Sequence, residues 1–173
     1  MLKRTLITSF DTWLPEQASN ASDDLLALLL HRGVLGNNVH TLRRLPVQTD
    51  LASQLVISAI NHVQPDLVLC LGMASHREWL SLESTGHDFE TEQAYTTMLD
   101  LEQLCRGLAM TEVSHHAGTF VCNGLYCNLL KYLRMHNPAT DCLFLHVPVL
   151  TIENQAALLA DCIQVLQRLQ VCG

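Results

Sequence analysis

The sequence lacks the features that mark several classes of protein. It has no run of Lys and Arg, and 10 basic residues against 17 acidic ones give a formal net charge of −7. We therefore expect no contact with nucleic-acid phosphates. No apolar stretch approaches the roughly 18 residues of a membrane-spanning helix, and the first residues show neither the long apolar run nor the cleavage site of a signal peptide. These absences predict a cytoplasmic protein with no membrane partner.

Signatures of cofactor and metal binding are also missing. There is no Walker-type or GxGxxG phosphate loop. Four possible zinc ligands lie close in sequence, namely His115, His116, Cys122 and Cys127. They form no Cys-x-x-Cys or His-x-x-x-His pair. Adjacent histidines on a strand would also point to opposite faces. The sequence therefore predicts no cofactor and no metal, and zinc is the less favoured alternative.

The cysteines do not form a disulfide pattern. Their number, seven, is odd, they are scattered, and Cys70, Cys142 and Cys162 stand among apolar residues. This usage is typical of buried, reduced thiols.

The composition predicts a folded globular protein. Of the 173 residues 49% are apolar and 16% are charged, which is enough apolar material for an ordinary core. No repeat, low-complexity tract or linker divides the chain, so we expect one domain over residues 1–173.

Strand-like and helix-like segments alternate along the chain. The pattern predicts strands over 2–9, 39–47, 67–71, 110–114 and 142–147. It predicts helices over 25–31 with Ser22 as N-cap, 51–63, 92–108, the segment after Cys122, and 152–169. Residues 67–71 are apolar at every position, which is typical of a central strand covered on both faces. We therefore expect an α/β fold, a three-layer sandwich of a mainly parallel sheet with helices on both faces.

Several of the predicted strands end in residues suited to chemistry or binding. Ser9-Phe10, Gly72-Met73, His115-His116 and His146-Val147 all stand at such ends. Ligands of parallel sheets bind at the carboxyl ends of the strands, so we expect the functional site at this edge.

Cys122 stands where a strand passes into a helix. Apolar residues recur after it at helical spacing: Leu125, Leu129, Leu130 and Leu133. Backbone N–H groups and the helix dipole would stabilise a thiolate in the first turn. With His146 available as a base, the pattern favours a cysteine hydrolase. The alternative is a cysteine that fills the core, which we expect for Cys127.

Four segments together resemble one family. They are residues 7–13 (ITSFDTW), 71–83 (LGMASHREWLSLE), 117–123 (AGTFVCN) and 144–148 (FLHVP). In this order they are similar to the segments of the pyroglutamyl peptidase I, or pyrrolidone-carboxylate peptidase, family. The resemblance implies a cysteine exopeptidase that removes an N-terminal pyroglutamyl residue from small peptides. Members often form dimers or tetramers, so a homo-oligomer is an open expectation.

The resemblance also implies roles for individual residues. Cys122 would be the nucleophile, His146 the general base, and Glu83 the group that orients the histidine. Arg77 would hold a loop or a neighbouring carboxylate. Five residues would line the pocket for the small, flat, uncharged ring: Phe10, Trp13, Met73, Phe120 and Val121. For Phe10 and Trp13, ordinary core packing is the alternative.

The chain departs from the family pattern around the pocket. Leu14-Pro15 follows Trp13 where the family has a glycine pair, and Met73 replaces a common glutamine. The connection from Glu83 to the helix predicted at residue 92 is shorter than in the family. Two alternatives thus stay open: a related cysteine amidase with another small substrate, and a non-catalytic binding protein. The joint presence of Cys122, His146 and Glu83 disfavours the latter.

Overall fold

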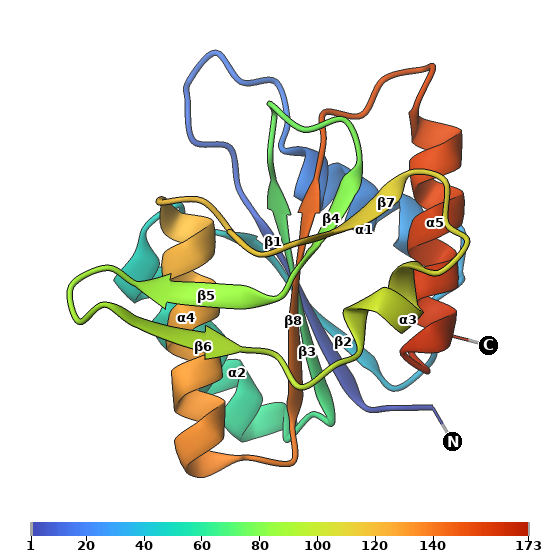
Figure 1. Ribbon diagram of the computed structural model, residues 1–173. Coiled ribbons are helices and arrows are strands. Elements are labelled where there is room, and N and C mark those ends of the chain that lie inside the picture. Colours follow the sequence, from blue (N-terminus) through green and yellow to red (C-terminus); the bar gives the residue numbers. More distant parts are fainter. Residues whose placement is uncertain (1, 173) are drawn as a thin grey trace.

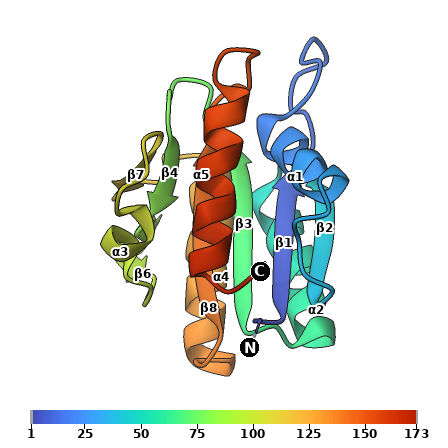
Figure 2. The ribbon, with the colours of Figure 1, turned by 90° about the vertical axis from the view of Figure 1, so that its right-hand side faces the viewer.

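A six-stranded sheet forms the centre of the protein. The structure, a computed structural model, describes residues 2–172. The strand order is β2-β1-β3-β8-β4-β7 (Figures 1 and 2). The strands are β1 (Thr5–Phe10), β2 (Val39–Leu45), β3 (Leu67–Met73), β4 (Leu80–Glu83), β7 (Thr111–Ser114) and β8 (Asp141–Val147). Strands β5 (Thr85–Asp88) and β6 (Gln93–Thr96) form a separate hairpin.

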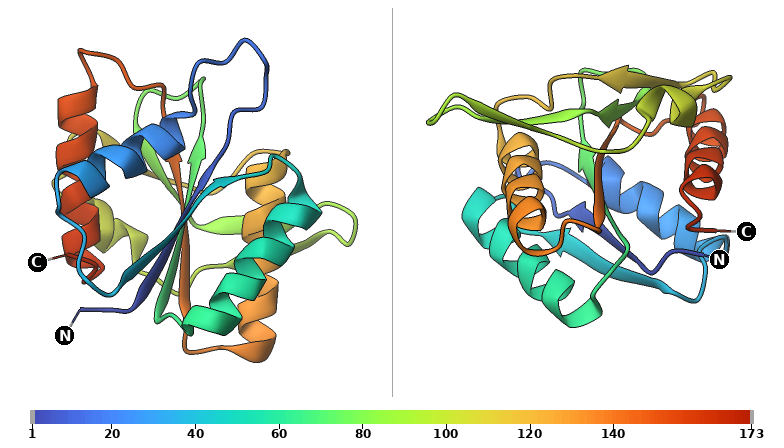
Figure 3. Two further views of the ribbon diagram at one scale, coloured as in Figure 1. Left: turned by 180° about the vertical axis from the view of Figure 1, so that it is seen from behind. Right: turned by 60° about the horizontal axis from the view of Figure 1, so that its bottom comes forward.

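Helices cover both faces of the sheet. On one face lie α1 (Ala21–His31), α3 (Leu101–Cys105) and α5 (Gln155–Arg168). On the other face lie α2 (Thr49–Val63) and α4 (Val121–His136), and Figure 3 shows the two layers on either side of the strands. The helices of each layer pack against one face of the sheet and form a separate apolar core there. No helix within residues 2–172 combines the length and the apolar character that crossing a membrane requires.

The sheet is parallel except at one junction. Strands β2, β1, β3 and β8 run in the same direction, and β4 pairs antiparallel with β8 and parallel with β7. The predicted α/β sandwich with a mainly parallel sheet is therefore confirmed. Residues 67–71 lie in the interior strand β3 and are buried, as their uniform apolar character predicts.

One face and one edge of this sheet position the site. The segments that leave β1, β3 and β8 emerge together at the top of Figure 1. Helix α4 begins beside the end of β3, because Cys122 in its first turn packs at Gly72. Side chains at the ends of β1, β3 and β8 and in the first turn of α4 can therefore meet.

The prediction of a helix over 92–108 is wrong. Residues 93–96 form β6, and only Leu101–Cys105 is helical in this region. The hairpin packs closely on α4: a Cβ added to Gly86 would lie 2.7 Å from both Cα and N of Cys127. The packing of this hairpin on α4 therefore overrides the helix propensity of the segment that begins at residue 92. The connection after Glu83 is a hairpin, rather than a short loop to a helix.

Two smaller differences concern α1 and β4. Asn20, rather than Ser22, caps α1, since its side-chain oxygen accepts a hydrogen bond from the Ser22 N–H at 3.0 Å. Ser22 is instead buried, and its hydroxyl accepts a bond from the Phe10 N–H. Strand β4 was not expected from the pattern.

All seven cysteines are free thiols, in agreement with the prediction.

Candidate active site

Cys122 lies in the first turn of α4, as the sequence predicts. Its thiol packs against the end of β3: a Cβ added to Gly72 would lie 2.8 Å from Cys122 Sγ and 2.6 Å from the Phe144 ring. Such distances are shorter than real Cβ contacts, so only glycine at position 72 leaves room for the sulfur. Gly72 is also the register partner of His146 across β3 and β8. The thiol thus faces the strand pair that carries the histidine.

His146 and Glu83 form a buried pair. They come from antiparallel neighbours, because Ser81 on β4 is the register partner of His146 on β8, and Glu83 is two residues further along β4. Side chains at such diagonal positions are within reach of each other. Glu83 Oε1 lies 2.7 Å from His146 Nδ1. Glu83 is fully buried and His146 is 5% exposed, so the carboxylate fixes the ring.

Arg77 completes this cluster. Its Nη1 lies 2.7 Å from Glu83 Oε1, and its Nη2 donates to the His116 carbonyl at 3.0 Å. Arg77 was expected to hold a loop or a neighbouring carboxylate, and it contacts both.

The pKa values of the pair fit a base and its orienting anion. Burial would raise the pKa of Glu83, but the hydrogen bond from His146 and the Arg77 cation bring it below its ordinary value. Glu83 is therefore ionised and accepts the Nδ1 proton, which leaves Nε2 of a neutral ring free to take up another. Burial lowers the pKa of His146, and the opposing effect of Glu83 is smaller. At neutral pH the ring is uncharged.

The prediction that the helix end stabilises a Cys122 thiolate is wrong for this conformation. Burial raises the pKa of the Cys122 thiol to about 12, with Cys70 and Glu83 adding to the effect, while a backbone N–H and Arg77 act against it. The sulfur sits against Gly72 and Phe144, where loss of hydration outweighs the helix end. Within residues 2–172 no hydrogen bond joins Sγ to His146. The resting thiol is neutral and needs a base.

All five predicted pocket residues meet at Cys122. Phe10, Trp13, Met73, Phe120 and Val121 line a pocket of about 90 Å³. Gln17, Asn20, Val47 and Cys122 complete its wall. Phe10 and Val121 are buried, whereas Trp13 and Phe120 are more than half exposed, with ring centroids 4.9 Å apart. Both expectations for Phe10 hold, since it packs in the core and also lines the pocket.

Sequence reasoning assigned no role to Gln17, Asn20 or Val47. Gln17 accepts a hydrogen bond from the Trp13 N–H at 2.9 Å and donates to Met73 Sδ at 3.6 Å. Asn20 donates to the Asp11 carbonyl at 2.9 Å. The only signal for Gln17 and Asn20 was an amide side chain in the segment after Trp13, and Val47 had none. The pocket wall contains no charged residue.

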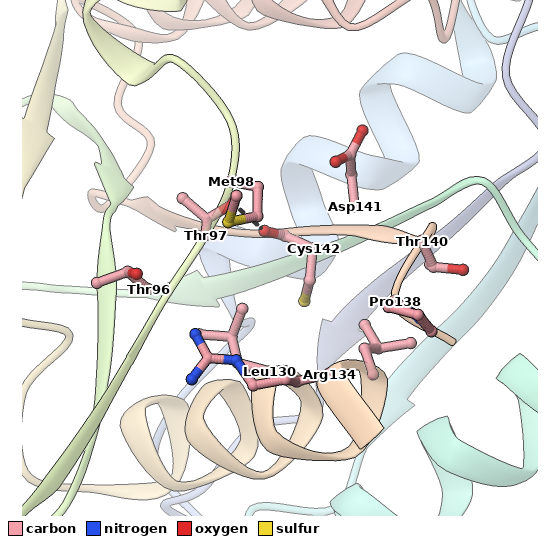
Figure 4. A pocket seen from close by; sticks show the side chains of 10 residues that line it. Thr96, Thr97, Met98, Leu130, Arg134, Pro138, Thr140, Asp141 and Cys142 are labelled. Atoms are coloured by element: carbon pink, nitrogen blue, oxygen red, sulfur yellow. Dashed lines mark hydrogen bonds between the residues drawn. The ribbon is translucent and has the colours of Figure 1, made fainter. Parts of the chain in front are cut away.

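A larger cavity lies elsewhere and gathers none of these groups. It holds about 290 Å³ at the amino end of β8, and Figure 4 shows the Cys142 and Arg134 side chains turned into it. No residue that the sequence predicts for chemistry lines it. Cavity size therefore does not mark the candidate site, whereas the convergence of Cys122, His146 and Glu83 does.

The four residues of the alternative zinc site do not gather. Over the range from residue 2 to residue 172, no three His, Cys, Asp or Glu side chains are grouped to hold a metal ion. His115 Nδ1 is 2.8 Å from the Ser84 hydroxyl, and His116 Nδ1 accepts a bond from the Gly118 N–H.

Comparisons with known proteins agree with the resemblance seen in the sequence. A family model described as pyroglutamyl peptidase matches residues 87–162, which include Cys122 and His146 but not Glu83. The pyrrolidone-carboxylate peptidase of Brachyspira hyodysenteriae is 26% identical over 172 residues, or 86% of this chain and 84% of that protein. The pyrrolidone-carboxylate peptidase 2 of Photorhabdus laumondii is 28% identical over 86% of this chain and 78% of its own length.

Solved structures show the same fold. Pyroglutamyl peptidase I from Bacillus amyloliquefaciens aligns with a TM-score of 0.76 at 24% identity, covering 99% of this chain and 94% of that one. Pyrrolidone carboxyl peptidase from Thermococcus litoralis aligns with a TM-score of 0.80 at 18% identity, covering 96% and 92%. The predicted fold and the predicted resemblance are confirmed.

Proposed function

We propose that this chain, a cysteine-type hydrolase related to the pyroglutamyl peptidases, removes an N-terminal pyroglutamyl residue from peptides, with Cys122 as nucleophile. One observation carries the proposal. Cys122 borders a small uncharged pocket, and its sulfur packs at Gly72, the register partner of the histidine that Glu83 holds.

The pocket suits a lactam better than an ordinary N-terminus. A pyroglutamyl ring is neutral, and the wall offers aromatic and apolar surface with the amides of Gln17 and Asn20. An ordinary peptide would bring an ammonium group into a wall that has no carboxylate, at the cost of an unpaired charge. Trp13 and Phe120 stand at the more exposed part of the wall, where they would flank the ring.

The neutral thiol and the neutral imidazole define the first chemical step. His146 Nε2 takes the Cys122 proton as Sγ attacks the scissile carbonyl carbon. The imidazolium that forms is stabilised by Glu83, whose carboxylate already lies 2.7 Å from Nδ1. The first turn of α4 has no side-chain cap, so its backbone N–H groups are available to the carbonyl oxygen as it becomes negative.

The intermediate then divides into two products. The C–N bond breaks, His146 returns its proton to the leaving amine, and the pyroglutamyl group remains on Sγ as a thioester. Water, losing a proton to His146, attacks the thioester carbonyl and releases pyroglutamate, and the proton returns to Sγ. This cycle needs no cofactor.

A comparison of two amides tests the proposal. Pyroglutamyl and prolyl amides of one fluorescent amine differ only in the ring carbonyl. The pyroglutamyl ring is a neutral lactam, whereas the prolyl ring lacks the carbonyl and its nitrogen is a charged ammonium group. We expect release of the amine from the pyroglutamyl amide at least about 10²-fold faster in kcat/KM, the scale of one badly matched polar group. Equal or faster hydrolysis of the prolyl amide would favour the related amidase with another substrate and would overturn pyroglutamyl specificity.

A further inference from the structure

Three rings, two of them exposed and that of His87 half-buried, lie together outside the pocket. The ring centroids of His87 and His116 lie 5.5 Å apart, those of His87 and Phe89 6.0 Å, and those of Phe89 and His116 6.3 Å. Phe89 is 55% exposed, and His116 is exposed as well. None of the three lines the 90 Å³ pocket. We call these residues the ring stack.

The ring stack is tied to the nucleophile through the residue next to it. Asn123 is 3% exposed, and its side chain bonds both backbone groups of His87: Oδ1 accepts from the N–H and Nδ2 donates to the carbonyl, each at 2.8 Å. Asn123 thus binds the hairpin strand β5 as a neighbouring strand would. The bonds go to the backbone of His87, and its ring is held separately, with Nε2 3.3 Å from the His115 carbonyl oxygen.

A second tie runs to the candidate catalytic carboxylate. Arg77 contacts Glu83 with one nitrogen and the His116 carbonyl with the other. The His116 ring is held in turn by the Gly118 N–H at 3.0 Å. The ring stack is therefore fixed in relation to both Cys122 and the Glu83–His146 pair.

The loop before Cys122 separates the ring stack from the pocket. Phe120, at one end of residues 115–120, contacts Trp13 in the pocket wall, while His116, at the other end, contacts His87 and Phe89. A substrate with its pyroglutamyl ring in the pocket and its carbonyl at Sγ must direct its next residue away from the pocket. Exposed aromatic surface fixed to the same loop is then available to that residue.

We propose that His87, Phe89 and His116 form the subsite for the residue that follows pyroglutamate, and that this subsite favours a flat aromatic side chain. The inference rests on the proposed function. Ring pairs at such separations attract each other beyond the effect of buried area alone. We expect a preference of about 2- to 12-fold in kcat/KM for an aromatic over an alanyl residue, the range for one aromatic pair.

Competition between two peptides tests the subsite. Pyroglutamyl-Phe-Gly and pyroglutamyl-Ala-Gly at equal concentration give a product ratio equal to the ratio of their kcat/KM values. We expect a wild-type ratio above 2 that falls towards 1 in Phe89→Ala and in His116→Ala. Met98→Ala removes another exposed apolar side chain, one outside the stack, and should keep the wild-type ratio.

The outcomes separate the two proposals. A wild-type ratio near 1, or a ratio that neither variant changes, overturns the subsite and leaves the proposed function standing. No cleavage of either peptide by folded wild type, together with no release from the pyroglutamyl amide, overturns both. His87→Ala is a further variant in which the hairpin should keep its position, because Asn123 still binds the backbone at position 87. It should also lower the product ratio.

Discussion

Two buried carboxylates, Asp23 on helix α1 and Glu83 on strand β4, have different partners. Asp23, in the first turn of α1, accepts hydrogen bonds from Nε and Nη2 of Arg43, each at 2.8 Å, from Nε of Arg44 at 3.1 Å and from the Ser9 hydroxyl at 2.7 Å. Glu83 shares one oxygen between Arg77 and His146, each at 2.7 Å. Both have a pKa below the ordinary value, in each case against the effect of burial.

The difference lies in whether a partner can change its charge. The arginines around Asp23 stay protonated at every pH of interest, so this cluster holds β1, β2 and α1 together. His146, next to Glu83, can gain a proton during a reaction. Similar burial and a similar shift of pKa therefore accompany a structural brace in one place and a candidate catalytic pair in the other.

The brace also explains an irregularity of the sheet. The register between β1 and β2 shifts between Thr8 and Phe10, and Arg44 has a φ of 57°. This backbone conformation lets two consecutive arginines reach one carboxylate. Such a φ costs about 1–3 kcal/mol in a non-glycine residue, which the interactions with Asp23 offset.

Of the two carboxylates, Glu83 should matter far more for activity. In Glu83→Gln the imidazolium loses its anion and the ring loses its fixed orientation, so we expect kcat to fall by about 10²- to 10⁴-fold. Asp23→Asn is the matched control, since it neutralises another buried carboxylate, and the folded fraction should retain its kcat. Equal losses of kcat in both variants would contradict the distinction.

An alanine at position 72 should act through the thiol. Its Cβ would lie 2.8 Å from Cys122 Sγ and 2.6 Å from the Phe144 ring, so both must move. We expect more than about 10-fold loss of kcat/KM and a loss of about 1–3 kcal/mol in the free energy of unfolding. Urea denaturation and pyroglutamyl amide hydrolysis measure the two quantities. Unchanged activity would show that the position of Sγ does not matter.

Asp23→Asn should lower stability rather than chemistry. Losing the carboxylate leaves the two guanidinium groups and the Ser9 hydroxyl with a weaker partner. Since the arginine side chains are 35% and 67% exposed, we expect a loss of only about 1–2 kcal/mol.

This stability difference depends on pH in a defined direction. The pKa of Asp23 is lower in the folded state, so its contribution is complete above the ordinary value of about 4 and is lost as the pH falls through the folded value. Wild type and Asp23→Asn should thus converge in acid, as urea titrations at several pH values would measure. A difference that grows in acid would contradict the assignment.

The smallest effect concerns the acid side of the pH–rate profile. Burial lowers the pKa of His146 below 6.5, so kcat/KM should begin to fall only below that pH, as the ring becomes protonated. Glu83→Gln removes an influence that raises this pKa, and it should move the fall to still lower pH. A wild-type fall centred above pH 7 would refute this description of the base.

Much of the site could be predicted because strand ends and motifs are local. Cys122 and His146 stand at recognisable junctions, and the five expected pocket residues do lie around the cysteine. Glu83 was different. A lone carboxylate on the four-residue strand β4 carries no signal of its own, and only the resemblance pointed to it.

What the sequence could not predict depends on long-range packing. The hairpin that replaces the expected helix is set by the contact of Gly86 with α4 and by the bonds of Asn123 to His87. The pKa of Cys122 depends on how closely Gly72 and Phe144 surround the sulfur. The register shift at Arg44 depends on Asp23, which is 21 residues away in sequence. None of these contacts is visible in local spacing.

The most direct test of the central claim is release of a fluorescent amine from a pyroglutamyl amide under reducing conditions by wild type and by Cys122→Ala. We predict turnover by wild type and none by the variant, whose circular dichroism should match that of wild type. Turnover that survives in Cys122→Ala, or a folded wild type that releases nothing, would contradict it.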